Sequence, residues 1–248
     1  MFAALCSVCR RGAEFFAPDF AGALDLGGEA RQILLDGGGA RPATTGIPGS
    51  RRATATALST AGSGGFKRVV IDAPMSGGPV RARDGQMSLM LSGSSQTLNQ
   101  CTELLEAITP HRFVISETPG DAAKTKLANN LLAAINLAGV SEVLAMAQSW
   151  GLNPSTTLSV MQASSGQSWI GQDRMKRALE NDFLPRAHTS LLAKDTRLAL
   201  QACDALGVGQ PSLGQLATEH FEKACAEGYK DMDDASLFLL AGGKPISQ

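Results

Sequence analysis

The spacing of apolar residues changes along the chain and separates regions of different kind. Between residues 67 and 118, short β-branched runs alternate with turns and predict strands over Arg68–Asp72, Gln86–Leu91 and Arg112–Ile115. Between the second and third strands, apolar residues recur on one helical face, which predicts a helix over Ser95–Ile108. The order strand, strand, helix, strand is typical of an α/β domain.

From residue 119 to the end, the pattern predicts only helices. A segment from Asp121 to Trp150 is apolar on nearly all sides and stops before Gly151, a residue suited to end a helix. Polar residues such as Asn129 and Glu142 interrupt it and would be costly in hydrocarbon, so we expect burial among other helices and no membrane partner. Further helices are predicted over Pro154–Ala163, Asp173–Leu179, Ser190–Leu206, Ser212–Glu227 and Asp233–Leu240.

Residues 1–66 have a different composition. They contain twelve glycines and only three Val or Ile residues, whereas strands favour β-branched and aromatic side chains. Loop is predicted over Asp36–Gly65, and short helices at most over Ala13–Ala23 and Gly28–Leu35. The pattern thus predicts an atypical, poorly ordered segment over 1–66, an α/β part over 67–118 and an all-helical domain over 119–248.

Charge and cysteine content restrict the partners and the compartment. With 22 basic and 23 acidic residues, the net charge is −1, which excludes the basic footprint that nucleic acid or an anionic membrane surface requires. A small molecule is the expected partner. Five scattered cysteines and the lack of a signal peptide in residues 1–16 favour the cytoplasm. Cys6 and Cys9 have no second ligand pair, so we predict no metal site.

The first candidate for chemistry is the stretch Asp72-Ala-Pro-Met-Ser-Gly-Gly, which ends at Gly78. A strand end opens here into a turn containing Ser76, Gly77 and Gly78. Backbone N–H groups in such turns, together with a serine hydroxyl, suit an anion such as a carboxylate. The alternative is a plain Ser-Gly-Gly loop.

The second candidate opens the long apolar helix, from Gly120 to Asn130. At 3.6 residues per turn, Lys126, Asn129 and Asn130 share one helical face. Burial near the positive end of a helix would disfavour the charged form of a lysine and lower its pKa towards neutrality, as a general acid requires. The alternative is that Lys126 reaches solvent while the asparagines cap or bridge helices.

The third candidate is Ala193-Lys-Asp-Thr-Arg-Leu-Ala. Lys194 and Asp195 are adjacent, and adjacent side chains on a helix do not face each other, so we expect them to point in different directions. A solvated helical face is the alternative.

Taken in this order, the three stretches resemble the β-hydroxyacid dehydrogenases, the 3-hydroxyisobutyrate dehydrogenase-like enzymes, over residues 68–242. The first is similar to D-A-P-V-S-G-G followed by G-A-x-x-G, with Arg81 in place of a frequent glycine. The second resembles G-x-G-x-x-x-K-x-x-N-N, with Ala122 where the second glycine is usual. The third matches K-D-x-x-L-A. Three ordered motifs are more specific than any one of them.

The resemblance implies a fold class of α/β plus all-α: a truncated remnant of a Rossmann domain, then an all-helical domain of the 6-phosphogluconate dehydrogenase-like type that builds a homo-oligomer. It implies NAD or NADP as cofactor and a small 3-hydroxy acid, interconverted with its semialdehyde or keto form, as substrate. It also implies that Lys126 is the catalytic general acid or base and that Lys194 contacts the cofactor near the nicotinamide. The implied substrate-binding residues are Ser76, Gly77, Gly78 and Asn130.

The chain departs from this family in its first 66 residues. Family members begin with a strand and a G-x-G-x-x-G turn that receives the dinucleotide pyrophosphate, and this sequence contains no such fingerprint. Residues 1–66 are therefore either a genuine fold or an aberrant leader from a frameshift or misassigned start. The competing functional hypothesis is a non-catalytic, oligomerising remnant that cannot bind dinucleotide.

Overall fold

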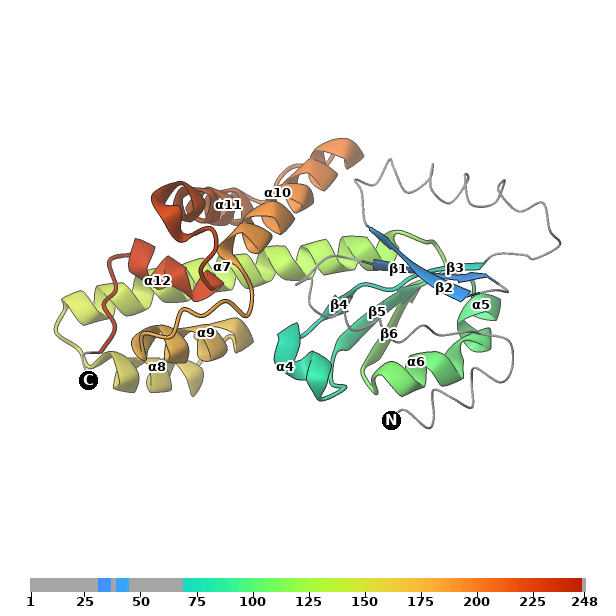
Figure 1. The fold of residues 1–248 in the computed structure, drawn as a ribbon. Helices are drawn as coiled ribbons and strands as arrows, with labels where there is room; N and C mark the ends of the chain where they lie inside the picture. Colours follow the sequence, from blue (N-terminus) through green and yellow to red (C-terminus); the bar gives the residue numbers. More distant parts are fainter. Residues whose placement is uncertain (1–30, 37–38, 45–68, 247–248) are drawn as a thin grey trace. The chain divides into compact units, whose positions relative to one another are not determined.

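The computed structural model describes residues 31–36, 39–44 and 69–246 (Figure 1). The chain divides into two compact units, Met1–Lys126 and Leu127–Gln248. The first unit contains a sheet with short helices, and the elements described in the second, up to residue 246, are helices. The predicted class, α/β followed by all-α, is confirmed by this order of elements.

The sheet of the first unit is mixed. Its strand order is β2-β1-β3-β5-β4, and β6 pairs with β5. The β5–β6 pair is parallel and the other pairs are antiparallel. The strands are β1 (Arg31–Asp36), β2 (Gly39–Thr44), β3 (Val69–Asp72), β4 (Met75–Ser76), β5 (Ser88–Ser92) and β6 (Arg112–Ser116).

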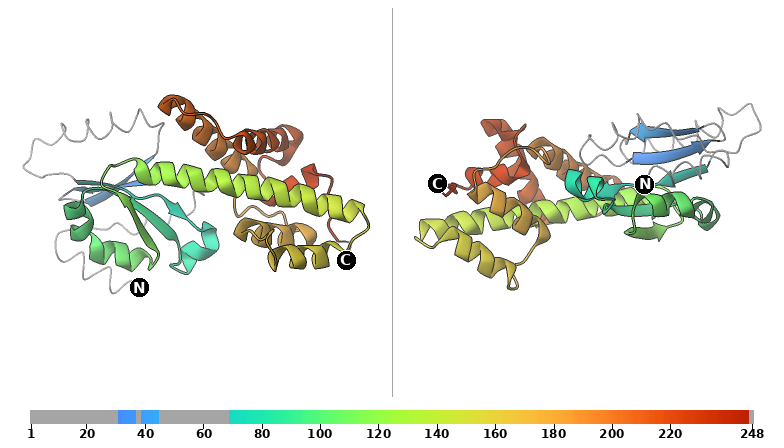
Figure 2. Two further views of the ribbon diagram at one scale, coloured as in Figure 1. Left: turned by 180° about the vertical axis from the view of Figure 1, so that it is seen from behind. Right: turned by 60° about the horizontal axis from the view of Figure 1, so that its bottom comes forward.

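Two helices cover one face of this sheet (Figures 1 and 2). They are α5 (Ser95–Gln100), which the Ser94 hydroxyl caps by accepting from Thr97 N, and α6 (Thr102–Ile108). The single helix predicted over this stretch is wrong at Cys101, where the backbone leaves helical geometry. The core of the unit is formed by Ile71, Ala73, Leu89, Leu91, Leu98, Cys101 and Leu105.

Strands β1 and β2 contradict two predictions. The helix predicted over Gly28–Leu35 is wrong from Arg31 onwards, and the loop predicted after Asp36 is wrong over Gly39–Thr44. The physical reason is pairing, because β1 lies antiparallel to β3 in the register Gln32↔Asp72 and to β2 across a two-residue connection. Ladder pairing with a neighbouring strand can override a weak local preference. Residues 13–23 lie outside the described residues.

The end of β3 is joined to the start of the long helix α7 (Asp121–Ser149). Asp72 is fully buried, and its Oδ2 accepts hydrogen bonds from Gly120 N at 2.8 Å and from Ala123 N at 3.1 Å. The first N–H groups of a helix have no partner within the helix and carry partial positive charge. A carboxylate from a strand 48 residues earlier therefore supplies the N-terminal cap of α7.

The second unit contains the remainder of α7 and the helices that follow it. The predicted helices are confirmed with shifted ends: α9 starts earlier than expected because Ser168 caps it, accepting from Gly171 N. The expected helix after Ser212 passes into a π-helical turn. The elements are α8 (Pro154–Gln162), α9 (Trp169–Leu179), α10 (Thr189–Leu206), α11 (Ser212–Ala224), η1 (Cys225–Tyr229), η2 (Asp234–Ser236) and α12 (Leu237–Leu240).

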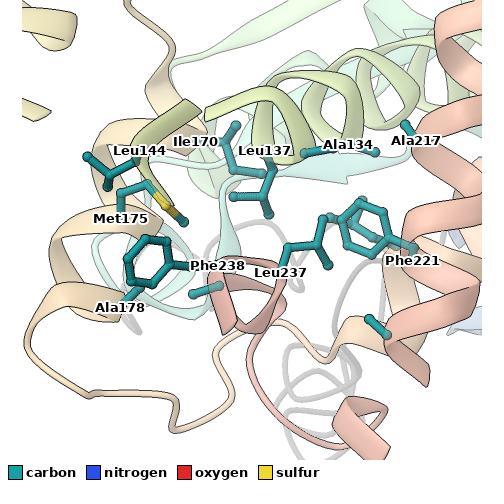
Figure 3. Packing of buried hydrophobic residues seen from close by; sticks show 14 of the residues in the cluster. Ala134, Leu137, Leu144, Ile170, Met175, Ala178, Ala217, Phe221, Leu237 and Phe238 are labelled. Atoms are coloured by element: carbon teal, nitrogen blue, oxygen red, sulfur yellow. The ribbon is translucent and has the colours of Figure 1, made fainter. Parts of the chain in front are cut away.

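Helix α7 forms the centre of this unit's core. Figure 3 shows Leu137 of α7 with Met175 of α9, Phe221 of α11 and Phe238 of α12, all fully buried. By length and composition alone α7 could cross a membrane, but more than half of its most apolar 18-residue stretch is buried inside the protein. Burial of this apolar surface is the main stabilising contribution to the unit.

Buried charges also hold the second unit together. Arg174 Nε lies 2.5 Å from Asp234 Oδ1, and Arg177 contacts Asp233 at 3.1 Å and Asp173 at 3.3 Å. Two guanidinium groups thus face three carboxylates. Burial, helped by the neighbouring Asp233, raises the pKa of Asp234 to about 6 despite its pairing with Arg174.

Replacing Asp72 by alanine should destabilise the start of α7. Two helix N–H groups would lose their acceptor, so we expect the free energy of unfolding to fall by about 1–3 kcal/mol. Amide hydrogen exchange at Gly120 and Ala123 should accelerate. The control is Asp84→Ala, which removes an exposed carboxylate from the same unit. Unchanged exchange at the two amides in Asp72→Ala would show that the cap is not needed.

Asp234 should make the second unit less stable as the pH rises from 4 to 7. A carboxyl group whose pKa is raised on folding stabilises the folded state fully below its unfolded pKa, and this contribution is lost as the pH rises through about 6. Asp234→Asn carries no charge at any pH and should remove that dependence. Urea unfolding at several pH values measures it, with exposed Asp231→Asn as control. Parallel curves for wild type and Asp234→Asn would contradict the prediction.

Candidate functional site

The predicted anion-binding turn lies between β4 and helix α4 (Gly78–Arg83). Ser76 ends β4, and Gly77 and Gly78 adopt positive φ angles of 141° and 73°. A Cβ atom on Gly77 would lie 2.9 Å from Arg81 Cδ and 3.0 Å from Met87 Sδ, so only glycine fits there. The aliphatic part of Arg81, which replaces the family's frequent glycine, packs against this turn.

Lys126 is buried in the second turn of α7, with 6% of its surface exposed. The alternative that it reaches solvent is therefore wrong. Lys124, two residues earlier, provides the contrast, because its side chain is 49% exposed and pairs with Asp121 at 2.7 Å. Burial of a lysine ammonium costs free energy unless other polar or charged groups bind it, so a buried lysine is a candidate for a functional role.

One helical turn after Lys126, a polar network joins α7 to α10. Asn130 Nδ2 donates to Asp195 Oδ2 at 2.7 Å, and both residues are buried, with exposures of 8% and 4%. Asn129 Nδ2 donates to Asn130 Oδ1 at 3.3 Å. An amide of α7 and a carboxylate of α10 therefore form a buried hydrogen bond between the two helices.

Lys194 belongs to the same network. The expectation that Lys194 and Asp195 point in different directions is wrong, because Lys194 Nζ lies 3.6 Å from Asp195 Oδ1. The four-carbon stem of lysine is long and flexible enough to turn back to its neighbour, and a buried carboxylate attracts it. The Lys194 side chain remains 38% exposed, so the network reaches solvent at this residue.

The predicted residues therefore fall into two groups. Ser76, Gly77 and Gly78 belong to the first unit, and Asn130 and Lys194 are linked in the second through Asp195. Lys126 closes the first unit and lies on the same helix as Asn130.

Sequence reasoning missed the roles of two acidic residues, Asp72 and Asp195. Both stand inside the quoted motifs, as the aspartate of D-A-P and the aspartate of K-D, and that position was the available signal. Their partners lie 48 and 65 residues away along the chain, which no spacing rule connects.

Other chemistry-bearing groups lie apart from these residues. A pocket of about 450 Å³ runs along α9, and two ion pairs line it, Asp182 with Arg186 at 2.8 Å and Asp173 with Arg177 at 3.3 Å. None of the predicted site residues lines it. Within the described ranges, no group of three His, Cys, Asp or Glu side chains could hold a metal ion.

Two family models match the chain one after the other. Residues 39–116 match the NAD binding domain of 6-phosphogluconate dehydrogenase, and residues 120–240 match the NAD-binding domain of NADP-dependent 3-hydroxyisobutyrate dehydrogenase. Their junction, between residues 116 and 120, immediately precedes α7. The cofactor class of these domains is NAD or NADP.

Curated and solved relatives agree with the models. L-threonate dehydrogenase of Escherichia coli strain K12 is 29% identical over 220 residues, which is 87% of this chain and 72% of that protein. A 3-hydroxyisobutyrate dehydrogenase structure from Salmonella typhimurium is 31% identical with a TM-score of 0.64, and covers 68% of this chain and 59% of that one.

The corresponding enzyme of Mycobacterium tuberculosis, solved with L-serine, is 26% identical with a TM-score of 0.62, and covers 68% of this chain and 60% of that one. This chain thus spans about three-fifths of the two solved proteins. The three motifs, the α/β and all-helical units and both family models lead to the same assignment. The chain belongs to the β-hydroxyacid dehydrogenase family.

Proposed function

We propose that this protein is an NAD(P)-dependent oxidoreductase that interconverts a small 3-hydroxy acid and its semialdehyde or keto form. The observation that carries the proposal is the burial of Lys126 at the start of an apolar helix, one turn before the Asn130–Asp195 hydrogen bond. A buried amine beside fixed polar groups has the features of a proton-transfer site.

The substrate class is supported by the relatives and by the predicted turn. The matched enzymes are named for L-threonate and 3-hydroxyisobutyrate, and one was solved with L-serine; all three compounds are small hydroxy acids. Such substrates carry a carboxylate, which the turn of Ser76, Gly77 and Gly78 would hold. Glycine at position 77 adds no side chain to a turn against which Arg81 and Met87 already pack closely.

The residues of the second unit fit one end of a nicotinamide dinucleotide. The partly exposed side chain of Lys194 pairs with Asp195, and its ammonium group would contact the cofactor near the nicotinamide. The sequence contains no G-x-G-x-x-G turn for the pyrophosphate, so the proposed cofactor contact is limited to the nicotinamide end. When bound, the nicotinamide exchanges a hydride with the carbon that bears the reacting oxygen.

Lys126 would transfer the proton, and Asn130 would orient the reacting oxygen. In the reducing direction, Lys126 donates a proton to the carbonyl oxygen as charge develops there. In the oxidising direction, its amine accepts the hydroxyl proton. Asn130 would orient the same oxygen. A buried site strengthens both interactions, because water competes less for the developing charge.

We also propose a cytoplasmic homo-oligomer assembled through the helical domain. Helix α7 exposes Leu132, Val143 and Met146, which lie within about 60° of one another around a helix with 3.6 residues per turn, and exposed Trp150 directly follows its last residue. A second copy of the chain would cover this apolar face. Free thiols at Cys101, Cys203 and Cys225 suit a reducing compartment.

Lys126→Ala should lower the turnover of small hydroxy acids by about 10²–10⁴-fold, because the proton donor or acceptor is lost. The matched control is Lys124→Ala, which removes an exposed lysine from the same helix and should retain wild-type turnover. Turnover is followed by nicotinamide absorbance with a panel of 3-hydroxy acids. Wild-type turnover in Lys126→Ala would remove this lysine from the mechanism.

Cofactor binding provides the separate control for this experiment. NADH and NADPH titrations, followed by nicotinamide fluorescence, should give nearly equal affinities for wild type and Lys126→Ala. No binding at millimolar cofactor would contradict the proposed activity of this polypeptide.

The double substitution Val143→Glu and Met146→Glu should dissociate the oligomer, because it places two charges in the apolar face of α7. Sedimentation velocity measures the mass, and Ser155→Glu, an exposed position outside α7, is the control. A monomeric wild type, or a double variant of unchanged mass, would contradict assembly through this face.

A further inference from the structure

The hydrogen bond between Asn130 and Asp195 has a fixed direction. An ionised carboxylate only accepts, so the atom of the Asn130 amide that lies 2.7 Å from Asp195 Oδ2 must be the nitrogen. The amide oxygen faces Asn129 and accepts from its Nδ2 at 3.3 Å. The orientation of the amide thus follows from the chemistry of its two neighbours.

The carboxylate of Asp195 is itself held. Its two oxygens have different partners, Asn130 at Oδ2 and Lys194, 3.6 Å away, at Oδ1. Asp195 is 4% exposed and lies on α10, whereas Asn130 lies on α7. In such a buried environment, successive hydrogen bonds polarise one another and a misdirected group is costly.

We propose that Asp195 is a positioning residue that makes Asn130 a hydrogen-bond donor to the reacting oxygen of the substrate. This inference rests on the proposed function. Asn130 has two N–H groups, and Asp195 binds one of them. The other points away from the carboxylate and is directed to the substrate. Without Asp195, the amide could rotate by 180° and present its oxygen, which would repel a carbonyl or alkoxide oxygen.

The orientation of the Asn130 amide matters most in the transition state. Negative charge develops on the substrate oxygen during hydride transfer to a carbonyl, and a fixed N–H donor stabilises that charge more than the ground state. Asp195 should therefore act on kcat more than on KM. A purely structural role would instead change stability and leave the kinetic constants of the folded enzyme unchanged.

Asp195→Asn tests this inference with little change in volume. Two facing amides can pair in either direction, so the orientation of Asn130 is no longer imposed. We expect kcat to fall about 10- to 100-fold with KM changed much less. Asp204→Asn, on the exposed part of the same helix, is the control and should behave as wild type. Circular dichroism verifies that each variant is folded.

A second readout does not need turnover. In ¹⁵N-labelled protein, the side-chain amide signals of Asn130 are identified by their loss in Asn130→Ala. In wild type, the Asn130 amide proton that is hydrogen-bonded to Asp195 should be shifted downfield and protected from exchange. Both features should vanish in Asp195→Asn but persist in Asp204→Asn. Absence of that shifted signal in wild type would overturn the inference.

The two readouts separate the inference from the function on which it rests. Wild type without turnover on any hydroxy acid would overturn the proposed function, whereas the amide signals would still decide whether Asp195 orients Asn130. A folded Asp195→Asn enzyme with wild-type kcat and KM would overturn the positioning role, whatever its stability.

Discussion

The arrangement of the candidate site depends on the capping of α7 by Asp72. One buried carboxylate oxygen accepts two of the N–H groups at the helix start, from Gly120 and Ala123. Lys126 follows Ala123 by three residues, less than one turn, so its position is tied to the end of β3. That strand end also leads into the turn of Ser76 and its two glycines. Within the first unit, the proposed proton-transfer residue and the proposed carboxylate-binding turn therefore share one anchor.

Buried carboxylates serve different purposes in the two parts of the helical unit. Asp233 and Asp234 pair with Arg174 and Arg177 and join the segment before α12 to α9, which is a structural role. Asp195 instead holds a neutral amide and one lysine. Because an amide has chemically different ends, pairing it with a carboxylate fixes a direction as well as a position.

The sequence predicts most of the helices and part of the site. Helices α7 and α10 are long and both stop shortly before or at a glycine, Gly151 and Gly207, so their patterns are strong. Strands β1 and β2 were missed because their stability depends on pairing with β3, and a glycine-rich segment carries little local preference for strand. Cys101 interrupts the predicted helix although the apolar spacing continues across it.

For the candidate site too, the sequence predicts which residues share one element but not which elements come into contact. Spacing along α7 predicts that Lys126 and Asn130 share a face, because both lie on one element. The bonds of Asp72 and Asp195 join residues 48 and 65 positions apart, and only the folded chain brings them together. The rule that adjacent helical side chains diverge failed for Lys194, since it describes Cβ directions and the lysine nitrogen lies four bonds beyond Cβ.

Helix α7 combines requirements that conflict in most helices. Its Leu137 side chain packs in the core, whereas Leu132 and Val143 are exposed. The same helix carries the buried polar residues Lys126 and Asn130, so its apolar side chains are not confined to one face. A lysine and two asparagines would weaken such a helix unless partners from other elements bind them. Asp72 binds its N-terminus and Asp195 binds Asn130. Two aspartates from distant elements thus allow an almost wholly apolar helix to carry buried polar groups at one end.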